Sequence, residues 1–279
     1  MIYDCFTFWN ERDLLEMRLK HLWNHVDKFV IAEANVTHRG KHKEWNLQSL
    51  LESDLSWAAE KIVYIKKEID TSDLDLDYLG DEYNPNSPFW IIENAQRNSL
   101  AEGLNDALPD DIIMIGDLDE FPNLHLFNQI EHITSNIQLF ALGMRIFGYY
   151  MDVEISEYFN GLWKGTVIGK KAHLTTPQGW RNLRTVVQWQ GNMGYHFSWI
   201  GKEAAMNKLK NTAHDEIRNS DIEKAFNPDE NGNFSHFIDP SIPVFQKVDI
   251  ENDVLYPRTV LDSRSTHPHL FYDSHCTVA

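Results

Sequence analysis

The first 32 residues of this 279-residue chain hold two short apolar runs with an amphipathic stretch between them. The runs at residues 2–8 and 28–32 have the length of strands, whereas residues 11–25 repeat leucines at helical spacing. We expect Asn10 to cap this helix, with Asp13 at the position of a capping box. A strand, a helix and a strand in this order form a βαβ unit with parallel strands, which predicts an α/β fold.

The predicted first helix carries one apolar stripe. Residues three or four apart share a helix face, and the stripe contains Leu15, Leu19, Leu22 and Val26. We expect this face to pack on the sheet, with Arg18 at its edge.

Helices and strands alternate along the rest of the chain. We expect helices over residues 44–59, 89–108 and 202–214, and strands over 61–65, 111–115 and most of 137–152 and 163–199. Residues 66–89 are acidic and aperiodic, which is typical of a long functional or mobile loop. Residues 227–279 are rich in Pro, Asn and Asp and should form little regular structure. Because no repeat or linker divides the chain, we expect a single domain over residues 1–279.

The charge balance argues against several classes of protein. Lys and Arg number 25 against 42 Asp and Glu, a net charge of −17, whereas nucleic acids and anionic membranes attract basic surfaces. No apolar run approaches the roughly 18 residues of a membrane span, and the N-terminus lacks the basic region of a signal peptide. Two cysteines make no disulfide framework. We therefore expect a cytoplasmic protein with no nucleic-acid partner and no membrane span.

An acidic motif follows the predicted strand at residues 111–115 directly. On a strand or at its exit, residues i and i+2 point to the same side, so Asp117 and Asp119 can face one ion together. Carboxylate oxygens suit Mn²⁺ or Mg²⁺, and open α/β sheets bind ligands at the carboxyl ends of their strands. A metal there can bridge the diphosphate of a nucleotide-sugar. The alternative is a solvated acidic turn that caps the next helix.

Three stretches of the chain, taken in order, resemble glycosyltransferase family 17. They are FTFWNERDLLEMRLKHLWNHVDKFVIAEANVTHRGK from residue 6, ENAQRNSLAEGLNDALPDDIIMIGDLDEFPN from residue 93 and GYHFSWIGKEAAMNKLKNTAHDE from residue 194. The resemblance covers most of residues 4–216. It implies a GT-A-like fold, in which helices flank a central, mostly parallel sheet.

The same resemblance implies an activity. It implies an inverting, metal-dependent transfer of a sugar from a UDP-sugar to a glycan hydroxyl, with UDP-GlcNAc as the first donor to test. It also implies that Asp117 and Asp119 are the family's metal motif. Residues 2–122 would be the nucleotide-binding half, 123–226 the acceptor-side half and 227–279 an irregular C-terminal segment. A metal-dependent phosphohydrolase and a non-catalytic sugar-binding module are the alternatives.

Donor-binding candidates lie at the exits of the first two strands and beside the metal motif. They are Phe6, Phe8, Asn10, Glu11, Glu33, Gln96, Arg97, Asp117 and Arg181. The phenylalanines could instead be core residues. Glu33 ends the second strand, where a carboxylate can accept hydrogen bonds from ribose or uracil or simply lie in solvent. Arg97 can bind a phosphate with its planar fork, or pair with Asp117 or Glu120.

The last candidates are a histidine ligand and a general base. His196 lies on a predicted strand between Tyr195 and Phe197, and it could be a core histidine. The resemblance favours a metal ligand instead, with Tyr195 and Phe197 anchoring the core while the imidazole faces the metal. His214 is its rival. An inverting transfer also needs a base that removes the proton of the acceptor hydroxyl. Candidates for that base, in no order of preference, are Asp152, Glu154, Glu203 and Asp215.

Overall fold

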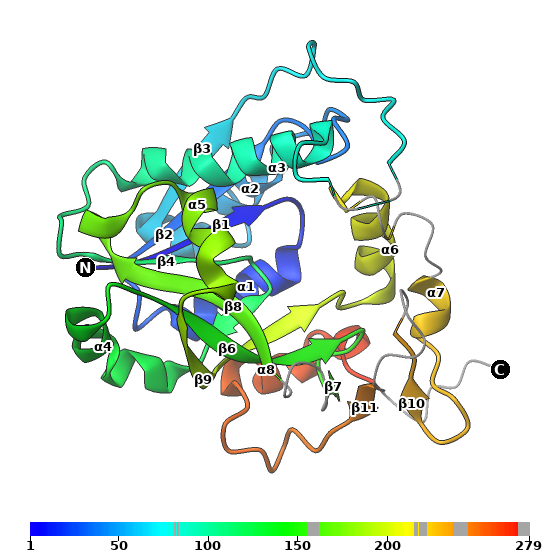
Figure 1. Ribbon diagram of the computed structural model, residues 1–279. Coiled ribbons are helices and arrows are strands. Elements are labelled where there is room, and N and C mark those ends of the chain that lie inside the picture. Colours follow the sequence, from blue (N-terminus) through cyan, green and yellow to red (C-terminus); the bar gives the residue numbers. More distant parts are fainter. Residues whose placement is uncertain are drawn as a thin grey trace.

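A computed structural model describes residues 1–80, 82, 84–155, 162–214, 217, 222–236 and 245–272. Its centre is one mixed sheet with helices on both faces (Figure 1). Side chains alternate between the two faces along each strand. In the first strand, Tyr3 and Cys5 pack into one hydrophobic cluster, and Phe6 and Phe8 pack into another on the opposite face.

Four parallel strands form one half of the sheet. They are β1 (Ile2–Phe8), β2 (Lys28–Ala34), β3 (Ile62–Lys67) and β4 (Ile112–Ile115), in the order β3-β2-β1-β4. All three pairings are parallel, which confirms the βαβ prediction. The carboxyl ends of these strands therefore meet at one edge of the sheet.

The other strands extend the sheet beyond β4. They are β5 (Glu120–Pro122), β6 (Leu139–Gly148), β7 (Val153–Ile155), β8 (Leu162–Lys170), β9 (Gln188–Ser198), β10 (Asn233–Phe234) and β11 (Phe245–Lys247). β8 is antiparallel to β4 and β6, but the longest ladder, between β6 and β9, is parallel. The expected α/β fold, with a central, mostly parallel sheet flanked by helices, is confirmed.

The helices are shorter than the sequence pattern predicts. They are α1 (Arg12–Leu22), α2 (Asn46–Leu51), α3 (Pro88–Asn98), α4 (Ile130–Asn136), α5 (Pro177–Asn182), α6 (Lys202–Asn211), α7 (Ile222–Ala225) and α8 (Arg258–Asp262). The predicted helices over 44–59 and 89–108 each end in a 3₁₀ segment, Ser56–Lys61 and Ser99–Leu104. A 3₁₀ segment also keeps residues three apart on one face, so periodicity does not mark the change. Within the described ranges, no helix is long and apolar enough to cross a membrane.

Two helix starts differ from expectation. No side chain caps α1, so the prediction that Asn10 is its N-cap is wrong; the Asn10 carbonyl instead accepts a hydrogen bond from the Arg12 N–H at 2.8 Å. Helix α5 interrupts residues 163–199, which the sequence predicts to be mostly strand. Thr176 caps α5 by accepting a hydrogen bond from the Gly179 N–H at 3.0 Å, and Pro177 fixes its first turn.

Arg18 is fully buried, not at the edge of α1 as expected. Its Nε donates to Asp4 Oδ2 at 2.8 Å and its Nη2 to Asp4 Oδ1 at 2.7 Å. The leucine stripe of α1 packs in the core as predicted. Helical periodicity places Arg18 beside that stripe, but it cannot reveal a carboxylate on the neighbouring strand that draws the guanidinium inward.

Candidate active site

A cavity of about 1140 Å³ opens at the carboxyl ends of the parallel strands. Its walls come from the chain after β1, the loop after β2, helix α3, the turn after β4, the end of β9 and helix α6. Open α/β sheets bind their ligands in crevices at this position. The cavity is therefore the candidate active site, and both Asp117 and Asp119 lie on its wall.

Among the described residues, one carboxylate oxygen of Asp119 has no hydrogen-bond partner. Its Oδ2 accepts a hydrogen bond from Lys208 Nζ of α6 at 2.9 Å. Its Oδ1 is buried, lies 3.6 Å from His196 Nε2 and has no hydrogen-bond partner in the described part of the chain. Burial opposes the negative charge, but Lys208 and His196 outweigh it and lower the pKa of Asp119. The side chain is thus an anion with one oxygen that no hydrogen bond from the described residues satisfies.

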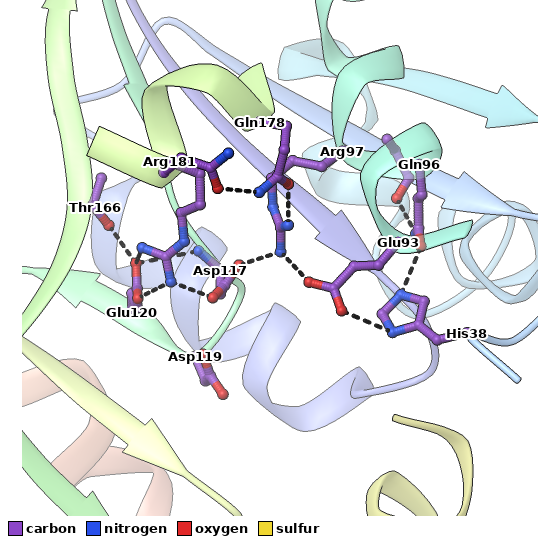
Figure 2. Close-up of polar contacts among 12 residues, drawn as sticks. His38, Glu93, Gln96, Arg97, Asp117, Asp119, Glu120, Thr166, Gln178 and Arg181 are labelled. Carbon is purple, nitrogen blue, oxygen red and sulfur yellow. Dashed lines mark hydrogen bonds and ion pairs between the residues drawn. The ribbon is translucent and has the colours of Figure 1, made fainter. Parts of the chain in front are cut away.

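Asp117 has different partners from Asp119 (Figure 2). Its Oδ1 accepts a hydrogen bond from Arg97 Nη2 at 3.0 Å, and its Oδ2 accepts one from Arg181 Nη2. Burial opposes the charge here too, but Arg181 and Arg97 lower the pKa of Asp117. An ion at Asp117 would have to displace an arginine.

A turn after β4 separates the two carboxylates. The expectation that they face one ion together assumes an extended chain. Instead β4 ends at Ile115, residues 118–119 form a turn, and the Glu120 N–H donates to the Asp117 carbonyl at 3.0 Å. In Figure 2 the Asp119 side chain points away from the arginines that hold Asp117.

Arg181 lies behind the cavity wall, not in it. It is buried, its Nη2 donates to Glu120 Oε1 at 2.6 Å, and it also binds Asp117. Glu120 further accepts hydrogen bonds from Trp163 Nε1 at 2.8 Å and Thr166 Oγ1 at 3.0 Å. The expectation that Arg181 contacts the donor is not supported, because both of its terminal nitrogens already bond to carboxylates.

Helix α3 turns three polar side chains toward the cavity. Gln96 Nε2 donates to carbonyl oxygens of β1 and β2 at 3.1 and 2.9 Å, and its Oε1 lies 3.2 Å from His38 Nε2. Glu93 accepts a hydrogen bond from Arg97 Nη2 at 2.9 Å and lies 3.5 Å from His38 Nδ1. Burial would raise the pKa of Glu93, but Arg97 and His38 lower it. Gln96 and Arg97 therefore lie at the cavity as predicted, and Glu93 was missed although it precedes Arg97 by one helical turn.

Glu33 is not a donor-site residue in this structure. It is fully buried and does not line the cavity. Its carboxylate accepts hydrogen bonds from the N–H groups of Asn46 at 2.8 Å and Leu47 at 3.1 Å, and from the Tyr64 hydroxyl at 2.6 Å, and it pairs with Lys43. Glu33 thus ties β2 to β3 and to the start of α2.

We expect Glu33→Gln to lower stability without changing donor affinity. The substitution leaves the Lys43 ammonium beside an uncharged group in a buried site, which should cost roughly 3 kcal/mol. Thermal unfolding and UDP titration measure the two effects, and Glu44→Gln, at an exposed position nearby, is the matched control. A weaker donor affinity with unchanged melting would instead place Glu33 at the donor.

The candidates at the exit of β1 divide between core and cavity. Phe6 belongs to the core, with the Arg18 guanidinium 4.6 Å from its ring centre, and does not line the cavity. Phe8, Asn10 and Glu11 do line it. Glu11 Oε2 accepts hydrogen bonds from the two preceding N–H groups, both at 3.1 Å, which fixes the chain at this wall.

His196 is the histidine beside Asp119. Its neighbours on β9 are buried on the other side, as the strand alternation predicts. Its ring stacks on that of Trp163 with centroids 4.8 Å apart. His214 also lines the cavity, but its ring lies against Trp90 with centroids 4.9 Å apart.

Among the candidate bases, Glu203 is the one that the structure places at the cavity. It is exposed, in the first turn of α6. Asp152 is buried elsewhere and accepts a hydrogen bond from the Tyr272 N–H at 2.7 Å, so it fastens the C-terminal segment. Glu154, on β7, accepts two hydrogen bonds from the guanidinium of Arg145 on β6. Asp215 lies outside the described residues.

Lys208 is a site residue that sequence analysis missed altogether. It lies on α6 with its ammonium at Asp119 and 5.2 Å from the centre of the Trp199 ring. Burial works against its charge, but Asp119 raises the pKa of Lys208. The sequence did contain a signal for Lys208. It follows the buried Ala205 by three residues, so helix periodicity places it near the buried face of α6.

A comparison with known protein families matches residues 1–228 to Glycosyltransferase family 17. The chain belongs to glycosyltransferase family 17. The match includes the exit of β1, the acidic turn after β4, the end of β9 and helix α6, all of which line the cavity. Glycosyltransferases as a class act on a sugar donor and an acceptor.

Individual relatives are similar over shorter stretches. The beta-1,4-mannosyl-glycoprotein 4-beta-N-acetylglucosaminyltransferases of Homo sapiens and Rattus norvegicus are each 27% identical to the chain over 120 residues. These residues are 40% of the chain, and they span only 20% of each relative. Among solved structures, S. aureus TarS 1-349 matches with a TM-score of 0.37 and 10% identity, covering 81% of this chain and 70% of that one.

Proposed function

We propose that this enzyme is an inverting, metal-dependent transferase that moves GlcNAc from UDP-GlcNAc to a glycan hydroxyl. The observation that carries the proposal is the buried Oδ1 of Asp119, which lacks a hydrogen-bond partner among the described residues and lies 3.6 Å from His196 Nε2 at the cavity wall. GlcNAc is proposed because both named relatives are N-acetylglucosaminyltransferases. Membership of a glycosyltransferase family speaks against the alternatives of a phosphohydrolase and a non-catalytic sugar-binding module.

The residues fit a divalent metal at Asp119 but not at Asp117. A carboxylate oxygen and an imidazole nitrogen suit Mn²⁺, and Mg²⁺ would favour the carboxylate. The described residues contain no group of three or more His, Cys, Asp or Glu side chains that could hold a metal, so the donor diphosphate and water would complete its ligands. When bound, the metal would stabilise charge that develops on the leaving diphosphate.

The protein's own groups have separate tasks in this proposal. Besides the proposed metal, the ammonium of Lys208 is a positive charge at the cavity wall, where it can bind a diphosphate oxygen. Arg97 holds Asp117 and so fixes the turn that carries Asp119. Glu203, exposed at the cavity, would remove the proton of the acceptor hydroxyl as that hydroxyl attacks.

Incubation with UDP-GlcNAc and Mn²⁺, without an acceptor, tests the reaction class. We expect slow release of UDP and free GlcNAc, and we expect excess EDTA to stop it. Release of inorganic phosphate would indicate a phosphohydrolase, and binding without turnover would indicate a sugar-binding module. Full activity in EDTA would contradict the metal dependence.

His196→Ala should weaken Mn²⁺-dependent UDP binding by about tenfold or more, because the ion would lose a protein ligand. His214→Ala is the matched comparison, since His214 lines the same cavity but lies against Trp90. Calorimetric titration of both variants with UDP and Mn²⁺ measures the difference. A loss confined to His214→Ala would mean that the wrong histidine has been assigned.

A further inference from the structure

Arg184 differs from the other arginines near the cavity. Arg97 and Arg181 both bond to carboxylates, whereas Arg184 has no ion-pair partner in the ranges that the structure describes. It is half-buried, and its guanidinium carbon lies 5.2 Å from the centre of the Trp163 ring. Burial and the charge of Arg181 lower the pKa of Arg184, while the carboxylates of Glu120 and Asp117, which form no ion pair with it, oppose this shift. Because a partly desolvated cation without a directly paired counter-ion is costly, this position favours an anionic ligand.

A second cation, Lys164, lies against the backbone of the residue that follows Arg184. Lys164 follows Trp163 on β8, and among the described residues its ammonium hydrogen-bonds only to the Thr185 carbonyl, at 3.5 Å. The same ammonium lies 5.7 Å from the centre of the Trp189 ring. A protein with a net charge of −17 thus places beside two indole rings two cations that form no ion pair with a carboxylate of the described residues.

Trp189 offers a flat apolar surface at the same place. Its side chain is 37% exposed, and its ring lies over the β6 backbone at Gly143, where an added Cβ would come within 2.5 Å of the ring. Two further apolar side chains, Leu183 and Val186, are exposed on either side of Arg184 in the chain. An indole face held in this way can stack on the C–H face of a sugar.

We propose that Arg184, Lys164 and Trp189 form an acceptor subsite for a sugar residue that carries an anionic group. The proposal rests on the proposed function, because this sugar would neighbour the residue that receives GlcNAc. Cations of this kind bind carboxylates and phosphate esters through charge-assisted hydrogen bonds, and the indole stacks on the sugar ring.

The position of the subsite separates it from the donor. Arg184, Lys164 and Trp189 do not line the cavity, whereas Trp163 does. Trp163 connects the two places, because its ring contacts the Arg184 guanidinium and stacks on His196. An acceptor that reaches from the subsite past Trp163 therefore arrives at the reacting centre.

Calorimetric titration of the full chain, without donor, tests the subsite. The probes are a tetrasaccharide that alternates glucuronate and N-acetylglucosamine, its neutral carboxyl-reduced form, and a tetrasaccharide phosphate ester. We expect an anionic probe to bind at least about tenfold more tightly than the neutral form, the effect of one charge-assisted hydrogen bond. The tighter of the two anionic probes identifies the anion as a carboxylate or a phosphate. Equal affinity for charged and neutral probes, or no binding of either anionic probe, would overturn the proposal.

Arg184→Gln and Lys164→Gln should each remove most of the preference for the anionic probe. Lys170→Gln is the matched control, because Lys170 lies on the same strand but pairs with Asp110 at 2.8 Å. An equal loss in Lys170→Gln would show a general charge effect and contradict the subsite.

UDP titration in Mn²⁺ separates this proposal from the proposed function. If the wild type binds UDP but no anionic probe, the subsite alone fails. If it binds an anionic probe but not UDP, the proposed donor chemistry fails and the subsite stands. Loss of UDP binding in Arg184→Gln would move Arg184 to the donor site and overturn the proposal.

Discussion

Replacing Asp119 by asparagine should abolish sugar transfer while the protein stays folded. The variant keeps the size of the side chain but removes the charge that would hold a metal and the donor diphosphate. The variant would lose the transition-state stabilisation that the metal supplies, on the order of several kcal/mol, which corresponds to orders of magnitude in rate. Folding should survive because the released Lys208 side chain is 37% exposed and can reach water. UDP release from UDP-GlcNAc and UDP titration in Mn²⁺ measure the loss.

Asp117→Asn is the matched control, since it removes the other carboxylate of the same motif. Both oxygens of Asp117 bind arginines whose side chains are almost completely buried. Its loss should therefore appear mainly as a lower melting temperature, because two buried cations lose a charged partner. A variant that melts like the wild type yet no longer binds UDP would show that Asp117 faces the ion, as residue spacing alone predicts.

Local patterns predicted the frame of the fold and the place of the site. The alternation in residues 2–8 and the leucine spacing of the first helix depend on neighbours a few residues apart, so the βαβ opening could be derived. The apolar run before Asp117 likewise placed an acidic motif at the carboxyl end of a strand. The family resemblance added His196, whose position between two core aromatics agrees with strand periodicity.

The partners of buried charges could not be predicted in the same way. Glu33 is bonded by residues that follow it on a loop and on α2, and Arg181 by carboxylates more than 60 residues away in the chain. Periodicity predicts on which face of its helix or strand a side chain lies, but it does not predict which other element packs against that face. Lys208 was missed for this reason, because only the packing of α6 beside the turn after β4 brings it to Asp119.

Replacing Arg18 should have the second large effect on stability and activity, because its side chain bonds to the backbone of the acidic turn after β4. Its Nη1 donates to the carbonyl oxygens of Asp117 at 3.1 Å and Leu118 at 3.2 Å, and to that of Glu120. The remaining nitrogens bind Asp4, which is also fully buried. One side chain thus joins α1 and β1 to the turn that carries Asp119. Arg18 thus bonds to three of the four carbonyl groups of residues 117–120.

Arg18→Met should destabilise the protein by about 3–5 kcal/mol, because it leaves Asp4 buried without a counter-charge. For a chain of this size that lowers the melting temperature by roughly 10 °C. The double variant Asp4→Leu with Arg18→Met separates the two roles of the arginine. Removing both charges should restore much of the stability, but the carbonyl groups of the turn stay unheld, so Mn²⁺-dependent UDP binding and turnover should stay low. A double variant that is both stable and fully active would show that Arg18 serves the fold alone.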